Sequence, residues 1–389
     1  MFAFPARYTN LAAARARFGD RVDRLAPFLT EVDPLADAVV SAIETLPRGE
    51  GWQMLTRAAA HGIASVPGAP ASFHALFAET ERVPAWVDWD TLDRGGEALL
   101  RAGPLGGLVL GLKSLVYGYA SPAGNKPLAL SGRLREGATR RLNETALFVR
   151  ATCVKGGMRP LGAGYQITVK VRLIHAQVRR MILRTGTWRE DLWGAPINQH
   201  DMAGTTILFS LALLEGLRQL GVRIAPDDAE AYMHLWRYSG HVMGVAPDLC
   251  PTSERDATRL ADLIAATQGR PDDDSRALTR ALLESPRQSA HTDAERKNAE
   301  RRIRFSEAIC RELLGEALAD DLEIERTRWR LVVPMVKRLV AGTEILRERV
   351  SVADRTALLA GRRYWDRVVE IGLAGATAEF GLPEKLAAA

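Results

Sequence analysis

Apolar residues recur every three to four positions along most of the chain, which places them on one face of an α-helix. The clearest helical segments are residues 10–29, 256–268, 293–318 and 331–350. Stretches rich in proline and glycine separate the helical segments, at residues 65–72, 120–128, 155–164 and 268–275. No series of alternating strands and no strand–helix–strand rhythm accompanies them. The pattern therefore predicts an all-α protein.

An acidic loop, PDDDS at residues 271–275, divides the chain into two helical sections. We predict a helical core with N-terminal helices over residues 1–270 and a C-terminal helical section over residues 271–384. We expect that section to pack on the core, so that one hydrophobic core is continuous through both; 389 residues are enough for this. Residues 385–389, KLAAA, resemble a vector-derived tail.

Composition and charge point to an ordinary globular protein, with 47% hydrophobic and 25% charged residues. The net charge is +5, and only seven of the 52 basic residues are lysine. A balance rich in arginine and alanine can follow from genome base composition, and no basic stripe interleaved with aromatic residues is present. We therefore expect no nucleic-acid partner.

The cysteines and the apolar segments indicate a reduced, cytoplasmic setting. Cys153, Cys250 and Cys310 are far apart and form no CxxC pair, so neither a zinc site nor a disulfide framework is expected. The first twenty residues lack the charged-then-apolar order of a signal peptide. The most apolar run, residues 103–120, contains Lys113 and many glycines, so no stable membrane span is expected.

Several common kinds of site are absent from the sequence. There is no glycine-rich phosphate loop, no GxSxG nucleophile elbow and no Glu-x-x-His pair of a di-iron bundle. His234 and His241 share a helix face but lie two turns apart, too far to bind one metal without a break in the helix. We expect each of these two histidines to be a core or surface residue.

His175 is the most informative histidine, because of its neighbours in VKVRLIHAQVRRMIL, residues 169–183. It lies at the edge of an apolar helical stripe, with Arg172 one turn before it and Arg179 one turn after it. A b-type haem needs an axial nitrogen, an apolar slot and cations for its two propionates, and this helix offers all three. A buried histidine bonded to a backbone carbonyl accounts for the same stretch, so both interpretations stay open.

A second helical stretch, residues 140–150, places Arg141 and Thr145 one turn apart on one face that continues through Phe148. A guanidinium and a hydroxyl over an apolar wall suit a haem distal pocket, because they can hydrogen-bond bound dioxygen and stabilise its negative charge. An exposed helix with an ordinary arginine is the alternative. Farther along, residues 196–205 indicate a helix start capped by Asn198, with Asp201 in the first turn. His200 there could support the site from behind its lining residues, but we expect it to be exposed at the helix start.

Five stretches together are similar to one family. They are VPAWVDWDTLDRGG (83–96), SGRLREGATRRLNETALFV (131–149), VRLIHAQVR (171–179), PINQHDMAGTTILFS (196–210) and YMHLWRYSGHVMGVAPDL (232–249). In their order and spacing they resemble the rubber oxygenases, or latex clearing proteins, and the MpaB-type oxygenases. The resemblance implies a globin-like helical core that binds one haem b, with His175 as the proximal iron ligand. It further implies Arg141 and Thr145 as the distal pair, and makes Arg172 and Arg179 candidates for propionate contacts.

Members of that family cleave isoprenoid carbon–carbon double bonds with dioxygen. The resemblance thus implies a haem-dependent dioxygenase with an apolar, unsaturated small molecule, such as a terpenoid or lipid, as substrate. Rubber-cleaving relatives carry an export signal, and they have a lysine where this chain has Glu144, so a solid polymer is not the expected substrate. Glu144 is expected either to transfer protons when buried or to face water. The subunit number, monomer or homodimer, stays open.

Two other functions remain as alternatives to the oxygenase. The first is a non-catalytic haem protein that senses or stores a gas or haem, which would keep His175 and its basic flank. The second is a helical binding protein without a cofactor, in which His175 is only a core residue.

Overall fold

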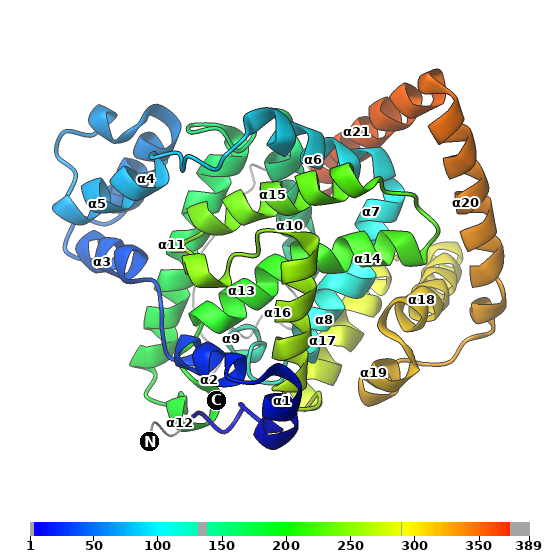
Figure 1. Cartoon of the computed structure of the whole chain (residues 1–389), viewed down its shortest axis with the longest axis horizontal. Coiled ribbons are helices and arrows are strands. Elements are labelled where there is room, and N and C mark those ends of the chain that lie inside the picture. Colours follow the sequence, from blue (N-terminus) through cyan, green and yellow to red (C-terminus); the bar gives the residue numbers. More distant parts are fainter. Residues whose placement is uncertain (1–3, 131–137, 289, 374–389) are drawn as a thin grey trace.

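The computed structural model describes residues 4–130, 138–288 and 290–373, except for the side chains of 138–141, 372 and 373. Within these ranges the chain folds into helices and contains no strand (Figure 1). The predicted all-α class is confirmed. The finer expectation of a globin-like core stays a prediction.

The helices follow one another with short connections. The first group is α1 (Leu11–Phe18), α2 (Arg21–Leu25), α3 (Pro34–Ile43), α4 (Glu50–His61) and α5 (Ala71–Thr80). The central group is α6 (Trp89–Ala102), α7 (Pro104–Val109), α8 (Leu115–Ala120), α9 (Lys126–Leu130), α10 (Ala138–Cys153), α11 (Ala163–Arg184), α12 (Glu190–Trp193), α13 (Gln199–Phe209), α14 (Leu211–Gln219) and α15 (Pro226–Val242). The last group is α16 (Glu254–Ala266), α17 (Asp273–Leu283), α18 (Asp293–Leu314), α19 (Glu316–Asp321), α20 (Val333–Arg349) and α21 (Ser351–Leu373).

Short single turns join some of these helices. The 3₁₀ turns are η1 (Ala26–Leu29), η2 (Ile63–Ser65), η4 (Pro247–Leu249), η5 (Ser285–Arg287) and η6 (Arg328–Leu331). A π-helical turn, η3 (Leu110–Ser114), lies between α7 and α8. In Figure 1, α3 to α5 lie at one side of the molecule and α20 with α21 at the other.

Two glycines account for the difference between the predicted and observed helices. The segments at 256–268 and 331–350 are confirmed as α16 and α20. The segment at 10–29 is instead broken after α1, where Gly19 has a φ of 64°, and the segment at 293–318 is divided where Gly315 has a φ of 84°. A left-handed conformation costs glycine little and ends a helix.

Helix α6 packs against α10, α15 and α21, and its backbone comes very close to those of α10 and α15. A Cβ atom on Gly95 would lie 2.2 Å from the carbonyl oxygen of Ala231 in α15, and one on Gly96 would lie 2.1 Å from that of Cys153 in α10. Any side chain at these positions would push the helices apart. The two glycines therefore fix the spacing of α10 and α15, which both line the cavity described below.

Two clusters of buried apolar residues form the interior. The large one includes Leu278, Ile309 and Trp365, so α17, α18 and α21 share it with the central helices. The smaller one joins the N-terminal segment to α13 and α16, through residues such as Tyr8 and Leu263. The expected single core is thus supplemented by a second cluster, because the N-terminal segment packs on the outside of α13. The boundary predicted at residue 270 stays a prediction.

The N-terminal segment also binds the central helices through its backbone. The amide of Ala6 donates to the carbonyl of Asp191, and the amide of Arg7 donates to that of Leu192, each over 2.9 Å. These bonds place the Arg7 side chain against α13. The N-terminus thereby helps to position one wall of the cavity.

None of the helices that the structure describes is long and apolar enough on its own to cross a membrane. Helix α6 and the stretch from Pro104 to Ala120 meet that criterion only as a pair, bent by 89°. The three cysteines are free, as the sequence predicted.

Candidate functional site

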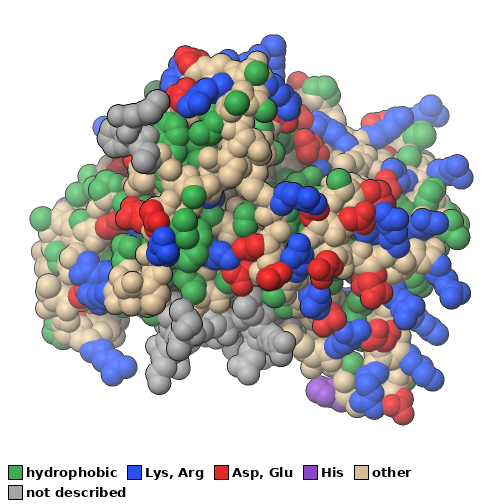
Figure 2. All heavy atoms as spheres, turned by 90° about the horizontal axis from the view of Figure 1, so that it is seen from below, with side chains coloured by type: hydrophobic (Ala, Val, Ile, Leu, Met, Phe, Trp, Pro, Cys, Tyr) green, Lys and Arg blue, Asp and Glu red, His purple; other side chains and the backbone are tan. Residues whose placement is uncertain are grey.

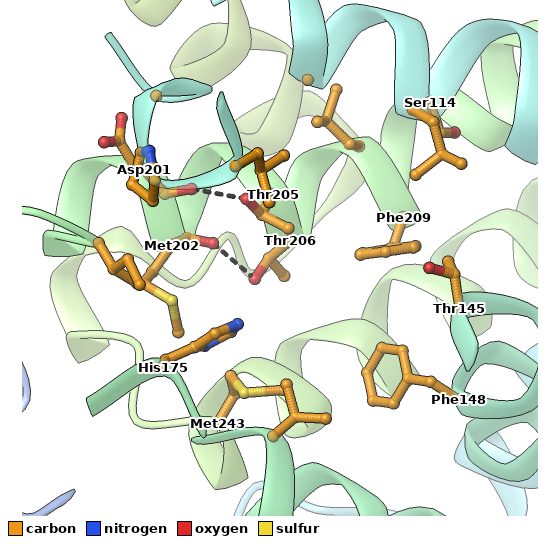
Figure 3. A pocket seen from close by; sticks show the side chains of 18 of the residues that line it. Ser114, Thr145, Phe148, His175, Asp201, Met202, Thr205, Thr206, Phe209 and Met243 are labelled. Carbon is orange, nitrogen blue, oxygen red and sulfur yellow. Dashed lines mark hydrogen bonds between the residues drawn. The ribbon is translucent and has the colours of Figure 1, made fainter. Parts of the chain in front are cut away.

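A cavity of about 420 Å³ lies between α8, α9, α10, α11, α13 and α15 (Figure 3). Its volume is within the range of roughly 300–1,000 Å³ found for small-molecule and cofactor sites. The walls are mostly apolar; the lining residues include Leu115, Tyr119, Phe148, Val171, Ile174, Val178, Ile197, Met202, Leu208, Phe209, Trp236 and Met243. The polar side chains in the wall are few: Ser114, Glu144, Thr145, His175, Asp201, Thr205, Thr206 and Ser239.

Helix α11 contributes His175 to this cavity. The stripe that the sequence indicated is only half-buried, because Val171, Ile174 and Val178 face the cavity with His175 rather than another helix. Figure 3 shows the tip of the imidazole ring pointing into the cavity. The opposite face of α11 is fully buried, with residues such as Leu173 and Ala176.

The His175 ring has no hydrogen-bond partner for its Nδ1 atom, although that atom is buried. A bond from this nitrogen to a backbone carbonyl, the alternative that the sequence left open, is therefore not present among the described residues. Burial, followed by the nearby charge of Arg179, lowers the pKa of His175 to about 4. The imidazole is thus neutral at neutral pH, which is the form that binds metal ions.

Arg172 lies on the buried face of α11 and points away from the cavity. Its guanidinium forms a two-pronged ion pair with Asp33 at the start of α3, over 2.6 and 3.0 Å. It also donates to Glu79 over 2.9 Å and to the carbonyl of Val242 over 3.2 Å. With its donors engaged in this way, Arg172 joins α11 to α3, α5 and α15.

Arg179 also lies on the face of α11 that points away from the cavity, and its guanidinium is likewise engaged by neighbouring groups. It donates to Asp37 in α3 over 2.7 Å and to the carbonyl of Ile197 over 2.9 Å. Neither Arg179 nor Arg172 lines the cavity. The geometry favours a structural role for both arginines over the propionate contacts that the resemblance implied.

Helix α10 supplies the wall opposite His175. Thr145, Phe148 and Glu144 line the cavity from this helix, and Figure 3 shows Thr145 and Phe148 across the cavity from His175. Glu144 is half-buried there, so it does not simply face bulk water. Arg141 lies in the first turn of α10, but its side chain is outside the described residues, and its pairing with Thr145 stays a prediction.

Three aromatic rings from α10, α13 and α15 form one corner of the cavity. Phe209 stacks on Trp236 with ring centroids 5.1 Å apart, and Phe148 meets each of them edge to face at 5.8 Å. Such pairs are preferred geometries for aromatic rings. The corner is flat-sided and apolar.

Helix α13 forms another wall of the cavity and begins at the cap residue that the sequence predicted. The side chain of Asn198 accepts the amide of Asp201 over 2.9 Å, which confirms it as the cap. His200, however, is buried rather than exposed, with its Nδ1 atom 3.3 Å from Asp201. Burial opposes ionisation of Asp201, but the Arg7 guanidinium, at 2.6 and 2.7 Å, outweighs it and holds the pKa of that carboxyl below its usual range.

A second cavity, of about 400 Å³, adjoins the first between α8, α13, α14 and α16. The two cavities share wall residues, namely Gly118, Gly124, Asp201, Thr205 and Leu208. The two cavities together therefore offer more space near His175 than the first cavity alone.

Some lining residues were not singled out from the sequence. Ser114 reaches the cavity from the π-helical turn η3, and its hydroxyl is buried without a hydrogen-bond partner. A π turn is frequent at functional sites but has no simple sequence pattern. Phe209 and Trp236 lie within two of the stretches that resemble the oxygenase family. That resemblance is the one sequence signal that could have pointed to them.

Comparisons with known proteins agree on one family. Residues 96–345 match the family model of the catalytic domain described as ER-bound oxygenase mpaB/B'/rubber oxygenase. The chain is 28% identical over 228 residues to the rubber oxygenase of Streptomyces sp. (strain K30), a match that covers 57% of this chain and 55% of that protein. It therefore spans about half the length of that relative. The fold is similar to the solved structure of latex clearing protein in the closed state, with a TM-score of 0.69, 24% identity, and coverage of 87% of this chain and 91% of the other.

Proposed function

Because the chain belongs to the family of MpaB-type and rubber oxygenases, we propose that it is a haem-dependent oxygenase. In this proposal it uses dioxygen to cleave or oxygenate an apolar, unsaturated small molecule such as a terpenoid or lipid. The observation that supports the proposal is the neutral imidazole of His175, which points into an apolar cavity of about 420 Å³. The cytoplasmic location expected from the sequence belongs to the same proposal.

The residues around His175 fit a haem in two respects. The imidazole offers a ring nitrogen to the cavity, and the surrounding side chains form the apolar shell that a porphyrin needs. No group of three or more His, Cys, Asp or Glu side chains within the described ranges could hold a bare metal ion. A haem iron needs only one such ligand from the protein. Cations for the propionates are not supplied by Arg172 and Arg179, which are engaged by carboxylates.

When bound there, the haem would supply the binding and activation of dioxygen. The protein's own groups then have separate tasks. Thr145 presents a hydroxyl on the wall opposite His175, where it can donate a hydrogen bond to developing negative charge. The ring corner of Phe148, Phe209 and Trp236 offers flat apolar faces to a double bond and excludes water from it.

The chemistry of the walls supports an apolar substrate. The cavity contains no lysine or arginine among its described lining residues, and one of its two carboxylates, Asp201, is already neutralised by Arg7. A charged substrate buried among these side chains would find no counter-ion, and burying an unpaired charge is costly. For the same reason the propionates of the proposed haem would have to reach solvent. The adjoining cavity offers room for an elongated molecule.

The experiment that tests the cofactor is visible absorption spectroscopy of the purified protein, oxidised and then reduced under carbon monoxide. We expect an intense Soret band that shifts when carbon monoxide binds. His175→Ala should retain less than about a tenth of the haem, because the axial bond is lost. His74→Ala, at an exposed position of α5, is the matched control and should keep the band.

Two further outcomes separate the alternatives. Oxygen uptake that depends on an added terpenoid alkene distinguishes an oxygenase from a haem protein that only senses or stores. A colourless protein that also fails to take up added haemin would contradict both, and would leave a helical binding protein without a cofactor.

A further inference from the structure

The outer face of the C-terminal helices carries most of the exposed large apolar side chains of the described chain. They lie in η6, α20 and α21: Leu331, Met335, Leu339, Ile345, Leu346, Val350, Val352, Leu359 and Ile371. Leu331 and Leu339 are 76% and 70% exposed. Figure 1 shows α20 along one edge of the molecule, and Figure 2 shows hydrophobic, basic and acidic side chains interspersed at that edge.

On α20 these residues form one stripe. Met335, Leu339 and Leu346 are four and seven positions apart, so all three fall on one face of the helix, and the exposed Val350 follows directly after the helix end. The opposite face meets the body of the protein, where the backbone carbonyl of Lys337 would lie 2.7 Å from a Cβ on Gly221. Helix α20 is therefore an amphipathic helix whose apolar side points outward.

The charges on the outer face of α20 are all positive. Arg338 and Arg349 border the stripe, are exposed, and have no ion pair among the described residues. The acidic residues of α20 turn the other way: Glu344 binds Arg347, and Glu348 binds Arg223.

Helix α21 also exposes apolar and basic side chains to solvent. Val352 and Leu359 are 68% and 55% exposed, and Arg355 and Arg363 share their helix face. The carboxylates on this face, Asp366 and Glu370, come later, in the second half of α21. Neither arginine has an ion pair in the part of the chain that the structure describes. Apolar and basic residues are thus also exposed together on the first two turns of α21.

The charge decides which partner fits this face. A second copy of the chain would bring the unpaired arginines of α20 and of the first half of α21 against one another, with no carboxylate on that part of the face to compensate them. A membrane surface with anionic lipids supplies the negative charge and an apolar layer together, and helices with an apolar face and arginines lie in such interfaces. We propose that α20 and the first half of α21 bind the surface of membranes that contain anionic lipids.

The test is flotation of the purified, full chain with lipid vesicles. We expect the protein to float with vesicles of phosphatidylcholine mixed with phosphatidylglycerol, and to bind much less to phosphatidylcholine alone. Each arginine is expected to contribute about fivefold to the partition coefficient at low salt. Arg338→Gln with Arg349→Gln should therefore reduce binding by about twenty-fivefold, and added salt should reduce the binding of the wild-type protein.

The leucine variants test the apolar stripe. Leu339→Glu with Leu346→Glu should abolish flotation, whereas Leu183→Glu, at a leucine of α11 that is 50% exposed, should leave it unchanged. All three positions are exposed, so the folded state is expected to persist, which circular dichroism would verify.

Three results would overturn the proposal. They are absence of flotation by the wild-type protein, equal flotation of the Leu339→Glu/Leu346→Glu variant, or a wild-type dimer that this variant converts to a monomer without any lipid binding. The last result would assign the face to a second copy of the chain. The assay needs neither haem nor substrate, so its outcome is independent of the proposed oxygenase activity.

Discussion

At the scale of single residues, Arg172 separates two explanations of the same sequence pattern. It lies one turn before His175, as a propionate contact would, yet its guanidinium is buried against Asp33 and Glu79. Removing one partner of a buried ion pair costs about 3–5 kcal/mol, because the other charge is left uncompensated. Arg172→Met should lower the free energy of unfolding of the haem-free protein by this amount, as measured by urea denaturation.

The double variant Arg172→Met/Asp33→Asn is the control for Arg172→Met. It keeps an acceptor for the amide of Ala36, which Asp33 caps at 3.2 Å, and it removes the unpaired charge. It should recover most of the lost stability. If Arg172→Met instead left the haem-free protein stable and weakened haemin binding, the propionate role would be correct.

The sequence located His175 but not the partners of its neighbours, and the reason is physical. Helical spacing tells which residues share a face of one helix, so Val171, Ile174 and Val178 could be placed beside His175. It does not tell which helix lies opposite. Asp33 is 139 positions away from Arg172 in the chain, and only the packing of α3 on α11 brings the two together.

At the scale of one element, α13 depends on its cap. Asn198 is fully buried; it accepts the amide of Asp201 over 2.9 Å and donates to the carbonyl of Ala195 over 2.8 Å. Asn198→Ala loses both bonds and should cost about 2 kcal/mol of stability in urea denaturation. It should also weaken haemin binding, because the first turns of α13 line the cavity.

Thr292→Ala is a suitable comparison for Asn198→Ala. Thr292 caps α18 through the amide of Glu295, and α18 does not line the cavity. Its loss should reduce stability by about 1 kcal/mol and leave haemin binding unchanged. Equal effects of the two variants on haemin binding would show that the start of α13 has no special connection to the cavity.

Elements marked by capping residues were predictable, and elements that deviate from regular geometry were not. Asn198 marked the start of α13, and the apolar period of α16 located it within two residues at each end. The π turn η3 has no such marker, so the position of Ser114 in the cavity wall could not be foreseen. The burial of His200 could not be predicted either, because it depends on the contacts of Arg7 and Asp201 at the start of α13.

At the scale of the whole molecule, the C-terminal section completes the core of the N-terminal section. Leu278, Ile309 and Trp365 belong to the large apolar cluster and are nearly inaccessible to solvent. A chain that ends at residue 270 would expose the surfaces these residues cover, and we expect it not to fold alone. Thermal unfolding followed by circular dichroism is the measurement. A truncated chain with a cooperative transition near that of the full protein would support an independent domain over residues 1–270.

The fold class and the family could be predicted from the sequence because the signals for both recur along the chain. Helical periodicity recurs in every segment, and five separate stretches carried the resemblance. The cavity is a single arrangement of six helices, and its volume depends on close approaches such as that of Gly96 in α6 to Cys153 in α10. Such distances are properties of the packed molecule and leave no periodic trace in the chain.

The bond between Arg7 and Asp201 has a practical consequence for handling the protein. It joins positions 194 residues apart, so the segment around Arg7 helps to hold a cavity wall in place. A protease that cleaves the chain just after Arg7 would therefore remove the counter-ion of Asp201. Comparisons between preparations require that Arg7 is intact in each of them, which mass spectrometry of the intact protein can check.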